Sequence, residues 1–63
     1  MKRMYKAFIY LNDENPIIMI VGGSSRKIII EKLEDFYRKV SGAAEIDIKL
    51  KEVIYENGNY RYK

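Results

Sequence analysis

The chain has 63 residues, which is room for a single domain spanning residues 1–63, and its apolar fraction of 48% is typical of folded proteins. It contains no histidine and no cysteine, which excludes disulfides and Cys/His zinc sites. The net charge of +3 is a mild excess that permits binding to anions without requiring it. A domain this small hides only about 60% of its unfolded surface, so regular packing or self-association has to stabilise it.

No apolar stretch reaches the roughly 18 residues that a membrane-spanning helix needs, and no sustained apolar segment follows the basic N-terminus as in a signal peptide. Together with the lack of cysteine, this predicts a cytoplasmic protein without membrane contact, metal or cofactor. Nucleophilic catalysis needs a nucleophile beside a base, and Ser24, Ser25 and Ser41 have no candidate base near them in sequence. We therefore expect no catalytic residues and no enzymatic activity.

Residues 4–11 are predicted to form the first strand, since side chains of different character alternate along them. One face is mainly aliphatic and the other mixes lysine with aromatic side chains. The polar residues 12–15 and Pro16 indicate a turn, because proline is confined to strand starts and edges. The first two strands should therefore form a hairpin.

Residues 17–21, with the sequence Ile-Ile-Met-Ile-Val, have no polar face. Such runs are typical of strands that are covered on both sides. The chain contains only one predicted helix, which can cover only one side. The other side then contacts a second copy or another partner, or it remains an exposed apolar patch.

A helix is predicted over residues 26–40, after the glycines at 22 and 23 end the second strand. Ser24 or Ser25 is the expected N-cap, and Gly42 is the expected C-cap. Apolar side chains recur at three- and four-residue spacing, which predicts a buried stripe. The stripe consists of Ile29, Ile30, Leu33, Phe36, Tyr37 and Val40.

A third strand is predicted over residues 46–55, and its second half permits two phases. Unbroken alternation turns Glu52 and Ile54 inward, whereas a bulge at residues 51–52 turns Val53 and Tyr55 inward and frees the carboxylate. We favour the bulge, since it avoids burying a charge. The Asn57-Gly58 pair then predicts a tight hairpin to a fourth strand over residues 59–63.

These elements predict an α+β fold, a single ββαββ domain with a four-stranded, mainly antiparallel sheet and one helix packed on one face. A right-handed crossover favours the strand order 2-1-3-4, in which all neighbours are antiparallel. The alternative order 1-2-3-4 requires one parallel pair. The favoured order leaves the apolar second strand on an edge, which soluble proteins usually protect.

The sheet face away from the helix is the main candidate for function. We expect a small binding module that acts by protein–protein interaction or as a homodimer, through the apolar strand edge and the aromatic sheet face. The predicted partner-binding residues are Phe8, Tyr10, Ile18, Ile20, Tyr60 and Tyr62. Alternatively the face binds single-stranded nucleic acid, whose bases stack on aromatic rings and whose phosphates contact Lys6, Lys49, Lys51 and Arg61. Either Tyr60 and Tyr62 or Arg61 should lie on this face.

The turn before the helix is a second candidate, for an anion. Gly23, Ser24, Ser25 and Arg26 combine a glycine turn, a helix N-terminus and a cation. Their spacing matches neither a Walker A loop nor a dinucleotide fingerprint. An ordinary capped turn explains the same residues.

Overall fold

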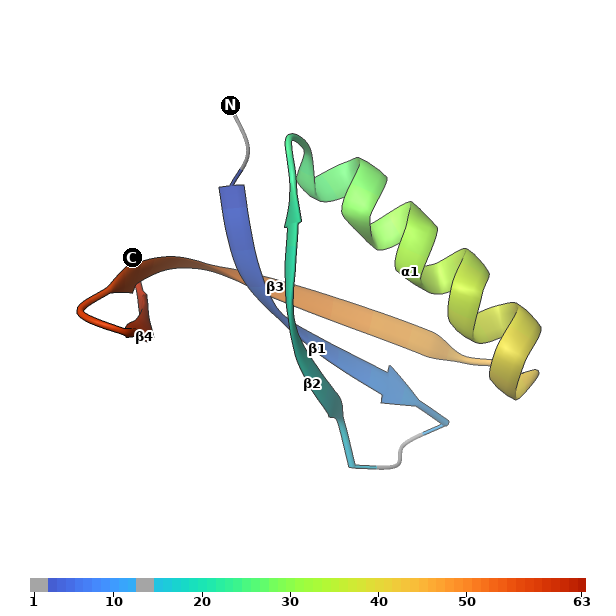
Figure 1. Cartoon of the computed structure of the whole chain (residues 1–63). Helices are drawn as coiled ribbons and strands as arrows, with labels where there is room; N and C mark the ends of the chain where they lie inside the picture. The colour runs from blue at the N-terminus through green and yellow to red at the C-terminus, as the bar shows by residue number, and fades with distance from the viewer. Residues whose placement is uncertain (1–2, 13–14) are drawn as a thin grey trace.

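The computed structural model describes residues 3–12 and 15–63, so Asp13 and Glu14 of the predicted turn lie outside the described residues. The sheet is antiparallel throughout and has the strand order β2-β1-β3-β4, with α1 between the second and third strands (Figure 1). This confirms the predicted ββαββ fold and its favoured strand order. The elements are β1 (Arg3–Leu11), β2 (Ile17–Gly23), α1 (Arg26–Ser41), β3 (Ile46–Glu56) and β4 (Asn59–Tyr62).

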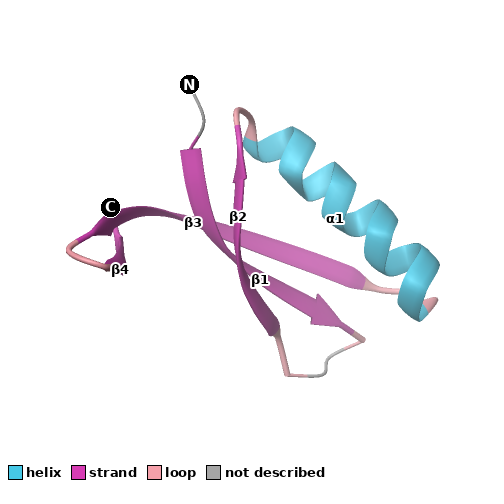
Figure 2. Ribbon diagram, in the orientation of Figure 1, coloured by secondary structure: helices cyan, strands magenta, loops and turns pink. Residues whose placement is uncertain are grey.

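The core lies between α1 and the central strand β1, because alternate side chains of β1 point towards the helix. Tyr5, Ala7 and Ile9 are almost completely buried, and Ile29 of α1 is buried with them. Gly23 shows how closely the helix approaches, since a Cβ atom there would lie 2.8 Å from a side-chain carbon of Ile29. Figure 2 shows α1 on one side of the sheet and β4 curling away on the other.

Both helix caps are as predicted, and the structure selects Ser25 over Ser24. The Ser25 side chain accepts a hydrogen bond from the backbone N–H of Ile28, 3.5 Å away, which satisfies a free donor of the first turn. Gly42 ends the helix with a φ of 66°, and its N–H donates to the carbonyl of Arg38. Glycine adopts this left-handed conformation without the penalty that a side chain brings.

The predicted buried stripe is wrong at its C-terminal end, where Phe36 is 55% exposed and Val40 is 67% exposed. At about 100° per residue, Phe36 and Val40 project on the same side of the helix as the buried Ile29. The burial of this side is therefore lost towards the C-terminal end, where Tyr37 is partly buried and Phe36 and Val40 remain in water. The Phe36 ring still makes an edge-to-face contact with Tyr37, with 5.0 Å between ring centroids.

The predicted bulge in β3 is also wrong. The register of β1 with β3 runs unbroken from the Leu11–Ile46 pair to the Met4–Val53 pair. Glu52 therefore points to the helix side, where Lys63 Nζ lies 3.3 Å from its carboxylate. Because this cation compensates the inward carboxylate, no bulge is needed to release it.

The end of the chain forms the predicted tight hairpin. Asn57 and Gly58 have φ angles of 52° and 81°, as a turn with two left-handed residues requires. The short β4 curls towards the face opposite α1, and its Tyr62 pairs with Val53. Val53 is therefore only 4% exposed, although it points away from the helix.

The molecule is less compact than a domain of its length usually is. Its radius of gyration is 12.3 Å, against about 11 Å expected for 63 residues. No described helix is long and apolar enough to cross a membrane. The radius of gyration is large because a single helix covers one face of a thin sheet.

The contrast between Ile9 and Val40 gives a test of this core. We predict that Ile9→Val lowers the free energy of unfolding by about 0.5–1.5 kcal/mol, because Ile9 is fully buried and a cavity remains. Val40→Ala should change it by less than about 0.5 kcal/mol, since Val40 is exposed. Urea unfolding followed by circular dichroism measures both. Equal losses would contradict the exposure of Val40.

Candidate binding surface

The sheet face opposite α1, which we call the open face, has no described element packed over most of it. The two glycines at the end of β2 identify the faces: a Cβ at Gly23 would meet Ile29 of the helix, and one at Gly22 would meet Met4. Met4 and Gly22 therefore lie on the open face. Every second residue along these strands, and the residues paired with them on the neighbouring strands, lie on the same face. They are Met4, Lys6, Phe8, Tyr10, Ile18, Ile20, Gly22, Asp47, Lys49, Lys51, Val53, Tyr55, Tyr60 and Tyr62.

Lysines and aromatic rings alternate across the centre of this face. Lys6 Nζ lies 5.6 Å from the ring centroids of both Phe8 and Tyr62. Lys51 Nζ lies 5.3 Å from the Tyr62 centroid, and Lys49 Nζ lies 5.8 Å from that of Tyr10. These distances are within cation–π range, where an exposed pair contributes about 0.5–1 kcal/mol. The rings thus hold the ammonium groups close to the sheet surface.

The open face has an unbalanced positive charge. Lys6 and Lys51 lie directly opposite each other on β1 and β3. Like charges in this position are destabilising. Against three lysines, the described strands place one acidic side chain, Asp47, on this face. An anion bound between Lys6 and Lys51 would relieve their repulsion.

The apolar part of the open face lies on either side of the lysines. On β2, Ile18 is 53% exposed and Ile20 is also exposed. On the β3–β4 hairpin, Tyr55 is 64% exposed, and its ring lies edge-on to that of Tyr60, with 5.1 Å between centroids. A hollow of about 220 Å³, bordered by Ile20, Val53 and Tyr62 among others, joins the two parts.

The structure brings nearly all the predicted binding residues together. Phe8, Tyr10, Ile18, Ile20, Tyr60 and Tyr62 share the open face with Lys6, Lys49 and Lys51. Arg61 is placed on the opposite face, and its Nη2 atom lies 3.0 Å from a carboxylate oxygen of Glu56. Sequence reasoning missed Val53 and Tyr55, because the expected bulge turned both inward. Unbroken alternation through the Asn57-Gly58 turn identifies both.

The turn before α1 uses its polar groups within the fold. The Ser25 hydroxyl caps the helix. The Arg26 guanidinium lies 5.1 Å from the ring centroid of Tyr5 and donates to the carbonyl of Leu50 at 3.3 Å. Arg26 therefore attaches the helix N-terminus to the sheet, which gives this residue of the predicted anion site a structural role.

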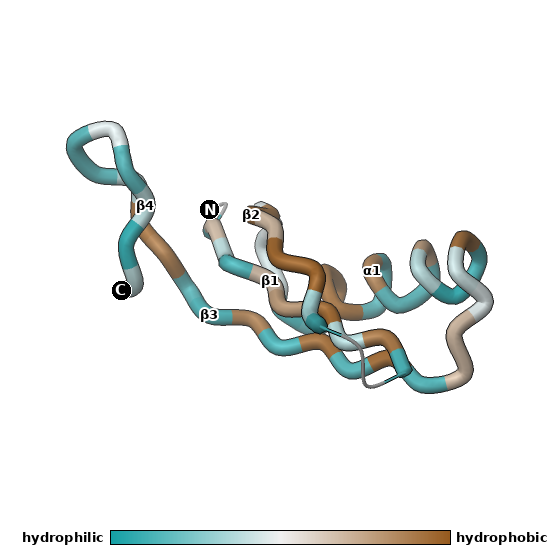
Figure 3. Tube along the Cα trace, turned by 90° about the horizontal axis from the view of Figure 1, so that it is seen from below, coloured by the Kyte–Doolittle hydropathy of each residue, from teal (hydrophilic) through white to brown (hydrophobic). Residues whose placement is uncertain are grey.

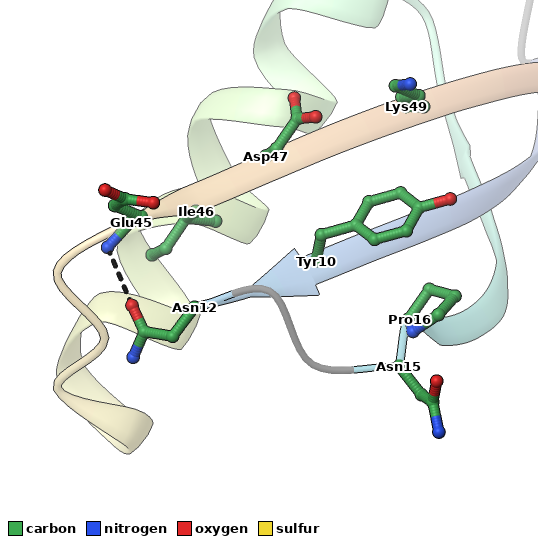
Figure 4. Close-up of a pocket in the computed structure, with 8 residues that line it drawn as sticks. All are labelled: Tyr10, Asn12, Asn15, Pro16, Glu45, Ile46, Asp47 and Lys49. Carbon is green, nitrogen blue, oxygen red and sulfur yellow. Dashed lines mark hydrogen bonds between the residues drawn. The ribbon is translucent and has the colours of Figure 1, made fainter.

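A hollow of about 520 Å³ lies at the ends of β1 and β3 (Figure 4). Asn12, at a φ of 49°, accepts a hydrogen bond from the N–H of Glu45 through its side-chain oxygen, at 3.1 Å. Its own N–H donates to the Glu45 carbonyl at 3.2 Å. Tyr10 and Lys49 line the hollow as well as the open face. Asn12 thus fixes the register of β1 with β3 at this end of the sheet. Among the described residues, no group of acidic side chains is placed so that it could hold a metal ion.

Comparison with known proteins gave no match to a family model, to a curated protein or to a solved structure.

The Lys6–Lys51 pair gives a test of the electrostatics of the open face. We predict that Lys51→Glu is more stable than Lys49→Glu by about 0.2–1 kcal/mol, because each variant loses one cation–π contact but only Lys51→Glu converts a like-charge pair into an opposite-charge pair. Lys49→Glu is the matched control. It makes the same charge change on the same strand and face, but Lys49 lies opposite Phe8 and not opposite another lysine. Urea unfolding at low salt should separate the two variants. Equal stability of Lys49→Glu and Lys51→Glu would contradict a direct Lys6–Lys51 repulsion.

Proposed function

We propose that this protein is a small, non-catalytic binding module that acts through protein–protein interaction, first of all through self-association. Its binding surface comprises the open face and the free edge of β2, by which we mean the side of β2 away from β1. The observation that carries this proposal is an apolar edge strand without protection. The lack of cysteine fits a reducing compartment, and we propose a cytoplasmic location.

The two edges of the sheet differ in a way that supports this proposal. Soluble proteins usually protect edge strands by making them short, charged or twisted away. The β4 edge has four residues, includes Arg61 and is followed by Lys63. The β2 edge has seven residues, and residues 15–25 include no charged side chain. Figure 3 shows most of β2 as a continuous apolar segment, whereas β3 alternates.

The exposed side chains of β2 extend this edge onto the open face. Ile18 and Ile20 point to that side, and the tyrosines of the β3–β4 hairpin lie beyond the central lysines. Burying an isoleucine that is half exposed gives a favourable free energy of about 1 kcal/mol. A partner that covers both the edge and these side chains thus gains backbone hydrogen bonds and apolar burial together.

The first test is the dependence of molecular mass on concentration. Light scattering or sedimentation should show a mass that rises from monomer to dimer as the protein is concentrated. Ile18→Lys should remove this rise, because a lysine on an edge strand opposes pairing. Val40→Lys adds the same charge at an exposed apolar position of α1 and should leave the rise unchanged. A wild-type mass of one chain at all concentrations would contradict self-association.

A second candidate function, binding of single-stranded nucleic acid, is favoured by the pairing of Lys6 with Lys51. Phosphates would lie between these ammonium groups, and bases would stack on the exposed rings of Tyr55 and Tyr60. An antiparallel sheet with aromatic side chains on an uncovered face is a common platform for such binding. Here the Lys6–Lys51 repulsion supplies a local reason to bind an anion.

The test of this candidate is an anisotropy titration with a labelled oligonucleotide at two salt concentrations. The affinity should fall as salt rises, since each phosphate contact releases counterions. The double variant Lys6→Gln with Lys51→Gln should bind more weakly and show a smaller salt dependence. The matched control, Lys27→Gln with Lys32→Gln, removes two exposed charges of α1 and should bind as the wild type does. No binding at low salt would rule this function out.

A further inference from the structure

Two hydrogen bonds outside the regular ladders reveal which backbone groups face the free edge. The Asn12 N–H donates to the Glu45 carbonyl, and this pair continues the β1–β3 register. In an antiparallel pair, hydrogen-bonded and non-hydrogen-bonded residue pairs alternate. Even-numbered residues of β1 therefore bond to β3, and odd-numbered residues bond to β2. The Lys63 N–H, which donates to the Glu52 carbonyl, leads independently to the same assignment, since even-numbered residues of β3 must then face β4.

This alternation continues into β2. Tyr5, Ala7 and Ile9 lie opposite Val21, Met19 and Ile17, so these odd-numbered residues of β2 use their backbone groups towards β1. The N–H and C=O groups of Ile18, Ile20 and Gly22 then face the free edge. Pro16 is next in this row, and it has no N–H to donate.

From this arrangement we infer that the free edge of β2 binds the β2 strand of a second copy, antiparallel, about a two-fold axis at Ile20. The two four-stranded sheets then form one continuous sheet, with both helices on the same side. This inference rests on the proposed function and deepens it, because it names the occupant of the edge and the register of pairing.

The register follows from the symmetry of the strand. β2 runs from Ile17 to Gly23, and its middle residue is Ile20. Pairing Ile20 with Ile20 of the second copy also pairs Ile18 with Gly22 at both ends, which forms about six hydrogen bonds. In this register every edge-facing N–H and carbonyl of the strand has a partner. Moving the axis by one residue towards the N-terminus, to Met19, places Pro16 opposite Gly22 and leaves the Gly22 carbonyls without a donor.

The side chains of the helix side fit the same register. Ile17 of the second copy comes to lie opposite Gly23, which has no side chain to obstruct it. Beside Gly23 is a hollow of about 470 Å³, which is bordered by Gly22, Ile28 and Ile29 among others. Ile17 is 37% exposed and Ile28 is 48% exposed in the single molecule. In the dimer, each Ile17 reaches the mouth of the partner's hollow and covers Ile28.

The size of the exposed surface agrees with a second copy. The molecule exposes 4782 Å², against about 4,200 Å² for a monomeric protein of its mass. The excess is about 500 Å² per copy. If both copies buried this excess, the interface would cover about 1,000 Å², near the lower limit for a specific interface. Residues 15–25 are uncharged, so the two paired strands themselves bring no like charges together, although each copy has a net charge of +3.

Single cysteines test the register directly, since the chain contains none. Ile20→Cys places two thiols across the axis, where Cα atoms of a hydrogen-bonded pair are about 5.5 Å apart, within disulfide range. Ile18→Cys places them four residues apart along the strand, about 13 Å, which is out of reach. Mild oxidation should convert Ile20→Cys to a covalent dimer and leave Ile18→Cys monomeric on a non-reducing gel. Faster cross-linking of Ile18→Cys would overturn the register.

Amide hydrogen exchange on the wild-type protein gives a second readout. Concentrating the protein should slow exchange at Ile18, Ile20 and Gly22 by about tenfold and leave Met19 and Val21 unchanged, because their amides already bond to β1. A dimer by light scattering without this pattern would overturn the inference and leave the proposed function standing. A protein that stays monomeric at all concentrations would overturn both.

Discussion

Packing of α1 against the alternate side chains of β1 is the interaction on which the whole molecule depends. Tyr5, Ala7 and Ile9 are buried there, and each large side chain contributes about 1.5–3 kcal/mol by leaving water. The fold has few other buried side chains, and a single helix cannot cover both sides of the sheet. The open face and the free edge of β2 are direct consequences, because the described residues form no second layer that covers them.

The open face remains compatible with water by using side chains that have both apolar and polar parts. Lysine stems lie along the sheet, and their ammonium groups stay near solvent while contacting aromatic rings. The β3–β4 hairpin adds to this cover, because it curls over the open face and buries Val53. Such a surface is polar enough for a free molecule and still contains rings that a partner can contact. The unprotected part is limited to β2 and its two outward isoleucines.

Local patterns in the sequence predict most of the fold. Alternation defines β1, the Ser25 and Gly42 caps define α1, and Asn57-Gly58 defines the last hairpin. The two errors both depend on contacts distant in sequence. The inward Glu52 is tolerated because Lys63 reaches it, and the exposure of Phe36 depends on where the C-terminal half of the helix lies over the sheet. The open face was predictable for the same reason as the fold, since alternation fixes which side chains share a face. The burial of Val53 was not, because it requires the curl of β4.

The difference between the two sheet edges also determines how far association can proceed. A strand edge that pairs with a different edge of the next copy produces an open fibre, whereas a strand that pairs with itself about a two-fold axis closes at two copies. In the proposed dimer, β2 pairs with itself about Ile20, and this pairing uses the unprotected edge of both molecules. The edge that remains at each end is β4, which is short, curled and flanked by Arg61 and Lys63. A third copy finds no long apolar edge there. The proposed dimer therefore uses the β2 edge for pairing, and the short, charged β4 edge would disfavour the addition of further copies.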